Sequence, residues 1–408
     1  MEVTEQKRER RKAIQIGSIA VFSYLACYYM RHLLSVTTPL MTNEGASTKE
    51  VLGTLSSFYM LAYAVGQLLN GIVGDRLKAK YMVSVGLAVS GISSICFPFA
   101  SHIVLQILCF VVMGFSLSML RGPLVKTISE NTTPAYARIC CTFFSFASFF
   151  GPLISSGLAI FLRWQGVFIV AGSAVFIIAI FAFFVFSLME KRGVIHFHSV
   201  KTEKIRFRDI FKVFRLENFG LYMIVGALVE ISAASIGFWI PTYMNEALGF
   251  TEEFSNIIFS VMTVIRATVP FLALGVFRLF KHRQFPMLTT SFALSALFFA
   301  GLLFFKQPIV NIVLFLLALM SVSLASALLW SIYIPSQAKS GMVSTLNGVL
   351  DFSGYAVSFL ANLVFTFSMS HIGWDGLIIM WASMMLFGVL SALVQARRKK
   401  GAQEALDT

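Results

Sequence analysis

The first long apolar run of the chain is IQIGSIAVFSYLACYYMRHLLSVTTPLM, residues 14–41, and it carries one arginine, Arg31. The run exceeds the ~20 apolar residues with which an α-helix crosses a bilayer. A guanidinium keeps its charge at any accessible pH, and placing it inside a membrane costs ~3 kcal/mol or more. Such a residue usually faces a water-filled or ligand-filled interior. An arginine tied to a carboxylate for packing alone is the alternative. The run therefore predicts a membrane helix with a functional residue at Arg31.

The composition indicates a polytopic helical membrane protein. Hydrophobic residues make up 57% of the chain and charged residues 12%, whereas charged residues are about 25% of a soluble domain. The net charge of +13 arises from Lys and Arg that flank the apolar runs, so we expect no nucleic-acid partner. The five cysteines lie in or beside apolar runs, which indicates no extracellular disulfide framework.

Apolar runs of membrane-spanning length recur twelve times, in two sets of six. They lie at about residues 14–40, 51–74, 82–101, 103–127, 138–162, 166–188, 219–245, 252–279, 285–305, 308–333, 342–368 and 373–395. The sequence therefore predicts an N-terminal bundle, residues 1–189, a basic cytoplasmic linker, residues 190–218, and a C-terminal bundle with a short tail, residues 219–408. We expect the linker to be a solvated hinge, whose Phe207–Phe214 part can form an amphipathic helix at the membrane surface.

Lys and Arg are distributed unequally between the two sets of loops. The N-terminus, the loops after even-numbered runs and the C-terminus hold 26 of the 32. The opposite loops hold only Lys49, Arg163 and Lys306, and the other three basic residues lie within runs. Basic residues accumulate on the cytoplasmic side of membrane proteins. The sequence therefore predicts a multi-pass protein of the cell membrane with both termini in the cytoplasm.

The two halves share an internal repeat. The segment PLMTNE, which begins at Pro39 in the first run, matches PTYMNE, which begins at Pro241 in the seventh. Duplicated six-helix halves are a common plan of membrane transporters, with the binding site near mid-membrane between the halves. The repeat therefore favours an all-α fold of twelve transmembrane helices in two pseudo-symmetric six-helix bundles.

Few ionisable residues remain at depth once the loops and the ends of the runs are excluded. They are Arg31, Arg121, Glu230, Arg266 and Asp351, in runs 1, 4, 7, 8 and 11. A shared polar cavity lined by a subset of helices explains why the charges avoid runs 3, 6, 9 and 12. Positive charge and aromatic surface in these helices define our candidate substrate-binding residues. These are Arg31, Tyr28, Tyr29, Arg121, Trp330 and Tyr333.

The roles of the other deep charges remain open at this point. Glu230 and Arg266 form either a structural charge pair or a site at which Glu230 titrates and couples protons to transport. Arg121 either extends the positive surface around Arg31 or reaches the membrane interface. Asp351 either relays protons or accepts hydrogen bonds at a helix–helix contact.

The loop between runs 2 and 3 reads GIVGDRLKAK, residues 71–80. Gly71 and Gly74 permit the close approach of another helix, and Asp75 can interact with the positive N-terminus of a facing helix. Arg76 and the lysines after it hold the loop at the cytoplasmic surface. The motif predicts a gating latch that forms in one conformational state and breaks in the other; a plain basic loop is the alternative.

This G-x-x-x-D-R motif and the twelve runs in two halves resemble the major facilitator superfamily over nearly the whole chain. One departure is Lys78, at a position where typical members have glycine. A narrower resemblance, to the organophosphate:phosphate antiporter branch, rests on residues of runs 1, 2 and 7. These are YYMR at 28–31, LGTLS at 52–56, Ala62-Tyr63 and WIPTY at 239–243.

The resemblance implies that Arg31 binds the anionic group of the substrate. A second arginine in run 7 of the branch lies six residues before the tryptophan, where this chain has Ala233. Glu230 and Arg266 also roughly reverse the order of base and acid found in runs 7 and 8 of the branch. These departures favour transport of an organic anion such as a carboxylate over the exchange of phosphate.

The residues and the resemblance together predict a secondary active transporter. It moves a small organic anion, a carboxylate or a phosphorylated metabolite, by alternating access, either as a proton-coupled symporter or as an antiporter. A non-transporting membrane receptor for an anionic metabolite and a proton-driven drug exporter are the alternatives. The sequence contains no Walker-type nucleotide site, nucleophile–base pair or metal-ligand motif, so we expect neither an enzyme nor a cofactor. The expected partners are the solute and the lipid bilayer, with the chain a monomer.

Overall fold

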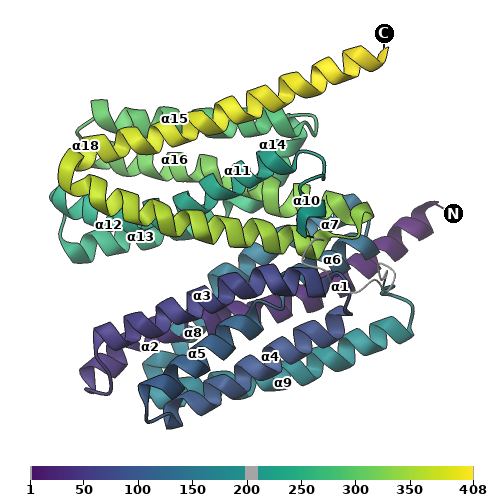
Figure 1. The fold of residues 1–408 in the computed structure, drawn as a ribbon, viewed down its shortest axis with the longest axis vertical. Coiled ribbons are helices and arrows are strands. Elements are labelled where there is room, and N and C mark those ends of the chain that lie inside the picture. Colours follow the sequence, from purple (N-terminus) through teal and green to yellow (C-terminus); the bar gives the residue numbers. More distant parts are fainter. Residues whose placement is uncertain (1, 198–209, 408) are drawn as a thin grey trace. The chain divides into compact units, whose positions relative to one another are not determined.

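The computed structural model of the protein describes residues 2–197 and 210–407 and contains helices but no strand within those ranges (Figure 1). The helices before the linker are α1 (Glu2–Arg31), α2 (Leu33–Asn43), α3 (Lys49–Gly74), α4 (Ala79–Cys96), η1 (Phe97–Phe99), α5 (Ile103–Leu117), α6 (Arg121–Asn131), α7 (Pro134–Thr142), α8 (Phe144–Phe161) and α9 (Trp164–Lys191). Those after it are α10 (Ile210–Val213), α11 (Phe219–Glu230), η3 (Ile231–Ile236), α12 (Gly237–Glu246), α13 (Glu252–Ala267), α14 (Val269–Leu279), α15 (Gln284–Phe304), α16 (Pro308–Ala327), η4 (Leu328–Tyr333), α17 (Ile334–Ser336), η5 (Gln337–Ser340) and α18 (Val343–Asp407). The predicted all-α fold is confirmed. Residues 198–209 of the predicted linker, which include part of Phe207–Phe214, lie outside the described residues.

Within the described ranges, nine helices are long and apolar enough to cross a membrane. The count is ten if α13 and α14, which meet at a bend of 43°, form one broken span. The segment Phe219–Ala233 is a shorter apolar helix that continues through η3 into α12. Helix α18 bends at Gly373, which has φ 61° and ψ −167°, so its two arms fold back on each other (Figure 1). These elements are consistent with the twelve predicted spans.

The chain divides into two compact units that do not follow the sequence halves. The first consists of Met1–Val213 and Tyr333–Phe352, and the second of Phe214–Ile332 and Ser353–Thr408. The first ten residues of α18, together with the turn before them, therefore belong with the N-terminal helices. Long-range contacts tie the start of α18 to α3 and α6, and the linear division at the linker stays a prediction.

Small residues set the close helix pairs of the first unit. A Cβ at Gly91 of α4 would lie 2.7 Å from the carbonyl oxygen of Gly172 of α9, and Ser94 Oγ donates a 2.8 Å hydrogen bond to the carbonyl oxygen of Phe168. Helices α4 and α9 accordingly lie side by side along most of their length (Figure 1). Such pairing by small residues and hydroxyl groups is the normal means of helix association where hydrophobic burial gives little driving force.

Aromatic packing dominates the second unit. Trp381 of α18 is fully buried and its ring lies 5.9 Å from the rings of Phe299 of α15 and Phe315 of α16. Helices α15 and α16 pack against each other around this core. Edge-to-face and tilted aromatic pairs at these separations fill volume and add specific geometry.

Four of the five deep charges lie at or near interruptions of their helices. Arg31 is the last residue of α1, and Arg121 is the first residue of α6. Glu230 ends α11 directly before the π-helix η3, and Arg266 lies two residues before Thr268, where α13 gives way to α14. Irregular backbone at membrane depth is tolerated where it is buried in protein or lines a water-filled cavity, and π-segments are frequent at functional sites. The interruptions and the charges therefore occur together in each unit, as expected where the backbone faces a polar interior.

A substitution at Gly348 of α18 tests the tight packing of the start of this helix against α3. A Cβ at this position would collide with the carbonyl oxygen of Gln67 and lie 3.1 Å from Gly71 Cα, both in α3. Gly348→Leu is therefore expected to destabilise the folded protein by about 1–3 kcal/mol, the usual cost of overpacking. The measurement is the thermal unfolding midpoint of the purified protein in detergent.

Gly157→Ala in α8 is the matched control, because nothing lies within 4 Å of a Cβ at that position. Alanine favours helix over glycine, so this variant should unfold at the wild-type temperature or slightly above it. Equal midpoints for the two variants would show that the contact between α3 and α18 does not constrain position 348.

Candidate functional site

Two tyrosine rings surround the guanidinium of Arg31. Its Cζ lies 4.9 Å from the ring centroid of Tyr63 in α3 and 5.7 Å from that of Tyr28. Tyr28 precedes Arg31 by three residues and therefore lies on the same face of α1. Cations within ~6 Å of an aromatic ring centroid are attracted to the face of the ring. The ring contacts position the charge inside the first unit.

Arg121 forms an ion pair with Asp351 in the same unit. Arg121 Nη1 lies 2.8 Å from Asp351 Oδ1, and the two side chains are 18% and 2% exposed. Asn347 Nδ2 donates a 2.8 Å hydrogen bond to the other carboxylate oxygen, Oδ2. Both oxygens of Asp351 are thus engaged by donors from α6 and α18. Of the roles that the sequence left open for Asp351, this geometry matches a helix–helix contact, with Arg121 as its partner.

The two arginines belong to one electrostatic cluster. Asp351 interacts with Arg31 as well as Arg121, and Arg121 interacts with the nearby tyrosines of α1 and α3. We call this group the Arg31 cluster; its members are Arg31, Arg121, Asp351, Tyr24, Tyr28 and Tyr63. The cluster therefore combines two guanidinium groups with one carboxylate. It can attract a negatively charged group.

The other predicted aromatic residues, Tyr29, Trp330 and Tyr333, are not members of the Arg31 cluster as defined above. Tyr29 is 6% exposed and lies ~100° around α1 from Tyr28; its carbonyl oxygen accepts a 2.8 Å hydrogen bond from Ser155 Oγ of α8. Trp330 and Tyr333 both lie in the π-helix η4. Tyr333 is buried, 2% exposed, whereas Trp330 is half-buried.

Sequence reasoning gave no role to Tyr63, although its ring lies over Arg31. A usable signal was present in α3, where Tyr59 and Tyr63 are separated by four residues and stack with ring centroids 6.2 Å apart. Residues at this spacing share a helix face. The spacing predicts an aromatic stripe, but it does not predict that the stripe faces α1.

Glu230 and Arg266 interact electrostatically within the second unit. Both side chains are half-buried. A Cβ at Gly354 of α18 would lie 2.5 Å from Glu230 Cγ, so glycine there permits α18 to approach the carboxyl group closely. The second unit thus has an acid–base pair at depth, beside the π-helix η3.

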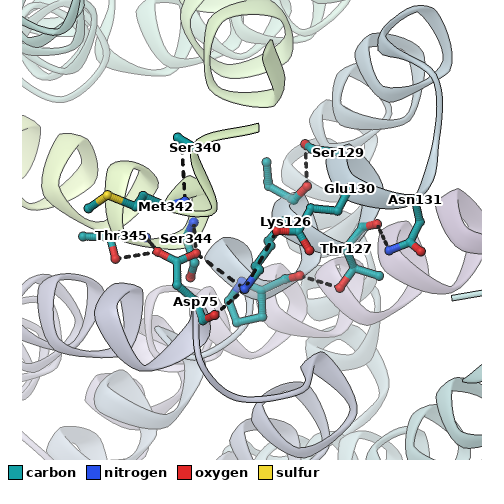
Figure 2. Close-up of polar contacts among 12 residues, drawn as sticks. Asp75, Lys126, Thr127, Ser129, Glu130, Asn131, Ser340, Met342, Ser344 and Thr345 are labelled. Carbon is teal, nitrogen blue, oxygen red and sulfur yellow. Dashed lines mark hydrogen bonds and ion pairs between the residues drawn. The ribbon is translucent and has the colours of Figure 1, made fainter. Parts of the chain in front are cut away.

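Asp75 binds the N-terminus of α18, as Figure 2 shows. Its Oδ1 accepts a 2.9 Å hydrogen bond from the backbone N–H of Ser344, and its Oδ2 accepts from the N–H and hydroxyl of Thr345 at 2.8 and 2.5 Å. The first N–H groups of a helix have no partners within it and favour a negative charge. Burial raises the pKa of the Asp75 carboxyl above its ordinary value, while Lys126 and the hydrogen bonds from Thr345 and Ser344 act in the opposite direction.

Lys126 of α6 holds Asp75 from the other side (Figure 2). Its ammonium group donates a hydrogen bond to the backbone carbonyl oxygen of Asp75, and it lies 3.9 Å from both Asp75 Oδ1 and Glu130 Oε1. The side chain is 3% exposed, and the ring of Phe197, which follows α9, lies 5.0 Å from Nζ. A buried lysine with two carboxylates and a ring around it is fixed in place.

The glycines of the motif bring the neighbouring backbones together. A Cβ at Gly71 would lie 2.9 Å from the Ser344 carbonyl oxygen, and a Cβ at Gly74 would lie 2.9 Å from Pro123 Cγ. Arg76 is half-buried in the turn after α3, where its N–H donates to the Val73 carbonyl oxygen at 3.0 Å.

The two lysines that follow bind the end of α9. Lys78 and Lys80 both pair with Glu190, Lys80 at 2.6 Å. Asp75, its partners and the glycines beside it form what we call the α18 latch. Its residues are Gly71, Gly74, Asp75, Arg76, Lys126, Ser344 and Thr345. In the ranges that the structure describes, no group of three His, Cys, Asp or Glu residues is arranged to hold a metal ion.

The helical bundle with buried charges and the comparison with known proteins identify the class of the protein. The chain belongs to the Major Facilitator Superfamily, whose family model matches residues 20–362. Over 94% or more of both chains it also superimposes on the human organic anion transporter MFSD10, with a TM-score of 0.69 and 13% identity. The predicted fold class is thereby confirmed.

Two curated relatives indicate which branch of the superfamily the chain resembles. It is 24% identical to the glycerol-3-phosphate transporter of Bacillus subtilis over 93% of this chain and 91% of that protein. It is 23% identical to the membrane sensor protein UhpC of Escherichia coli over 39% of this chain and 37% of that protein. These similarities confirm the predicted resemblance to the organophosphate:phosphate antiporter branch.

Asp75→Asn tests the α18 latch. The amide keeps the shape of the side chain but replaces one acceptor oxygen with an NH₂ group, which cannot accept from the N–H groups of Ser344 or Thr345. A buried donor left without its partner costs about 1–3 kcal/mol. We expect a lower unfolding midpoint and faster hydrogen exchange of the amides at the start of α18.

Asp375→Asn is the matched control for this substitution. Asp375 forms an ion pair with Lys306 at 3.2 Å in which both side chains are about two-thirds exposed, 68% and 67%. Exposed pairs contribute at most about 1 kcal/mol. An Asp75→Asn protein as stable as Asp375→Asn, with unchanged exchange at residues 343–346, would contradict the latch.

Proposed function

We propose that this protein is a secondary transporter that moves a small organic anion across the cell membrane by alternating access. The observation that supports it is the Arg31 cluster, in which the guanidinium groups of Arg31 and Arg121 interact with the carboxylate of Asp351. Guanidinium groups are costly at membrane depth, so a solute of opposite sign stabilises the cluster when it binds.

Arg31 is the residue that contacts the anionic group in this proposal. Its guanidinium lies against the rings of Tyr28 and Tyr63, and a guanidinium can donate the fork-like hydrogen bonds that carboxylates and phosphates accept. Tyr28 and Tyr63 orient the group, and Arg121 extends the positive surface. Tyr29, Trp330 and Tyr333 remain candidate substrate contacts.

A carboxylate or a phosphorylated metabolite fits this chemistry. The named substrate of the Bacillus subtilis relative supports the phosphorylated class. Ala233, at the position where the branch has its second arginine, favours a less highly charged anion such as a carboxylate. Either class can accept charged hydrogen bonds from a guanidinium such as that of Arg31.

Glu230 and Arg266 support coupling of transport to protons, with anion exchange as the alternative. The acid lies beside a π-helix and its partner base is half-buried.

The α18 latch would open and close once in each cycle, since its hydrogen bonds join groups that are far apart in sequence. Lys and Arg in the loops favour cytoplasmic termini, and we expect the chain to act as a monomer.

A membrane receptor for an anionic metabolite is the second candidate. The partial match to the sensor protein UhpC favours it. Counterflow in proteoliposomes separates the two candidates, because a receptor binds its ligand without flux. Drug efflux has no support from a specific contact.

Arg31→Ala and Arg31→Lys test the anion site. We expect at least a tenfold loss of anion uptake in proteoliposomes for Arg31→Ala, about the effect of 1.4 kcal/mol. Arg31→Lys should recover only part of it, because an ammonium lacks the planar fork. The control is Arg163→Ala, at an exposed position before α9. Uptake by both Arg31 variants at the wild-type rate would rule the site out.

Glu230→Gln tests proton coupling. If Glu230 carries the transported proton, the variant loses uptake driven by a pH gradient and loses the pH dependence of the rate, while anion exchange at equal pH persists. Glu44→Gln, at an exposed position after α2, is the control. An unchanged pH profile in the Glu230 variant would assign Glu230 a structural role only.

A further inference from the structure

The start of α18 is held at three points within the first unit. We call residues 343–352 the entry segment of α18. The backbone N–H groups of Ser344 and Thr345 bind Asp75, and Gly348 packs against the backbone of α3. Asp351 pairs with Arg121 of α6. The segment is therefore fixed at its first turn by one carboxylate and at its third turn by another.

The pair between Arg121 and Asp351 uses the chemistry that the proposed substrate would use. A guanidinium binds the carboxylate of a side chain and the carboxylate or phosphoryl group of a solute through the same charged hydrogen bonds. Asp351 already occupies Arg121 at 2.8 Å and is itself 2% exposed. An anion that enters the Arg31 cluster must therefore compete with Asp351 for Arg121.

We propose that Asp351 is an internal substitute for the transported anion. Without solute it neutralises Arg121 and holds the entry segment on α6. A bound anion takes over Arg121, and Asp351 leaves it. This inference rests on the proposed anion site at Arg31, and it adds a way in which binding is transmitted to the gating latch.

The route from Asp351 to the latch is short and rigid. Thr345 and Asp351 are six residues apart on one continuous helix, which is less than two turns. Asn347, between them, holds the carboxylate of Asp351 in place. Release of Asp351 removes the ion pair with Arg121, so the hydrogen bonds to Asp75 and the packing of Gly348 then carry more of the attachment.

The experiment measures anion affinity in the full-length protein in lipid nanodiscs. The probes are glycerol 3-phosphate and succinate, titrated by calorimetry into wild type, Asp351→Asn and Asp375→Asn. Asparagine keeps the shape of the side chain but is a weaker competitor for Arg121. We expect Asp351→Asn to bind the better probe about tenfold more tightly than wild type, and the exposed control Asp375→Asn to bind like wild type.

A double variant separates competition at Arg121 from a general effect of negative charge. In Arg121→Gln the residue that Asp351 competes for is absent. Adding Asp351→Asn to Arg121→Gln should therefore change the affinity by less than twofold. Tightening that persists in the Arg121→Gln background, or no tightening in Asp351→Asn alone, would overturn the proposal.

A second measurement reports on the entry segment directly. Bound anion should speed hydrogen exchange of the Ser344 and Thr345 amides in wild type, and Asp351→Asn should show the faster exchange without anion. Asn347→Ala keeps the charge of Asp351 but removes its orienting donor, and it should give a smaller change in the same direction. Unchanged exchange in both variants would overturn the link to the latch. If Asp351→Asn folds poorly, unchanged exchange in Asn347→Ala decides the test.

Arg31→Ala distinguishes failure of this inference from failure of the proposed function. If neither probe binds wild type or Asp351→Asn, both fail. If binding survives Arg31→Ala and still tightens in Asp351→Asn, the role of Arg31 fails and that of Asp351 stands. If binding is lost in Arg31→Ala but is unchanged in Asp351→Asn, the anion site stands and Asp351 is only structural.

Discussion

The constraint on which this structure depends is the cost of placing a guanidinium inside a membrane. The chain meets that cost in three ways. Arg121 has the carboxylate of Asp351 at 2.8 Å, Arg31 has two tyrosine rings within 6 Å, and Arg266 has the charge of Glu230. Arg31 and Arg121 share the carboxylate of Asp351 in one cluster, and these two guanidinium groups support our proposal of an anion site there.

The backbone is organised around the same constraint. The helices that carry Arg31, Arg121, Glu230 and Arg266 are each interrupted within a few residues of the charge. An interruption leaves peptide groups that need polar partners, and such groups are tolerated at depth only away from lipid. Charged side chains and broken helices therefore occur together because each requires a polar interior.

The start of α18 connects the Arg31 cluster to the motif that contains Asp75. It presents N–H groups to Asp75 at one end and the carboxylate of Asp351 to Arg121 at the other. The glycine between them permits contact with the backbone of α3. This segment lies within Tyr333–Phe352, the stretch that groups with the first unit, and it carries our proposal that a bound anion releases the latch.

The sequence by itself determined the helical membrane fold, the family, the deep charged residues and the glycine-rich motif before Asp75. Length and hydropathy of an apolar run depend only on neighbouring residues, and a lone charge in such a run stands out without any knowledge of packing. Tertiary structure alone decided which groups meet. Arg121 and Asp351 are 230 residues apart, and Tyr63 reaches Arg31 from another helix. Pairings over such distances depend on how helices rotate and cross, which is set by many small packing contacts at once and leaves no local pattern in the sequence.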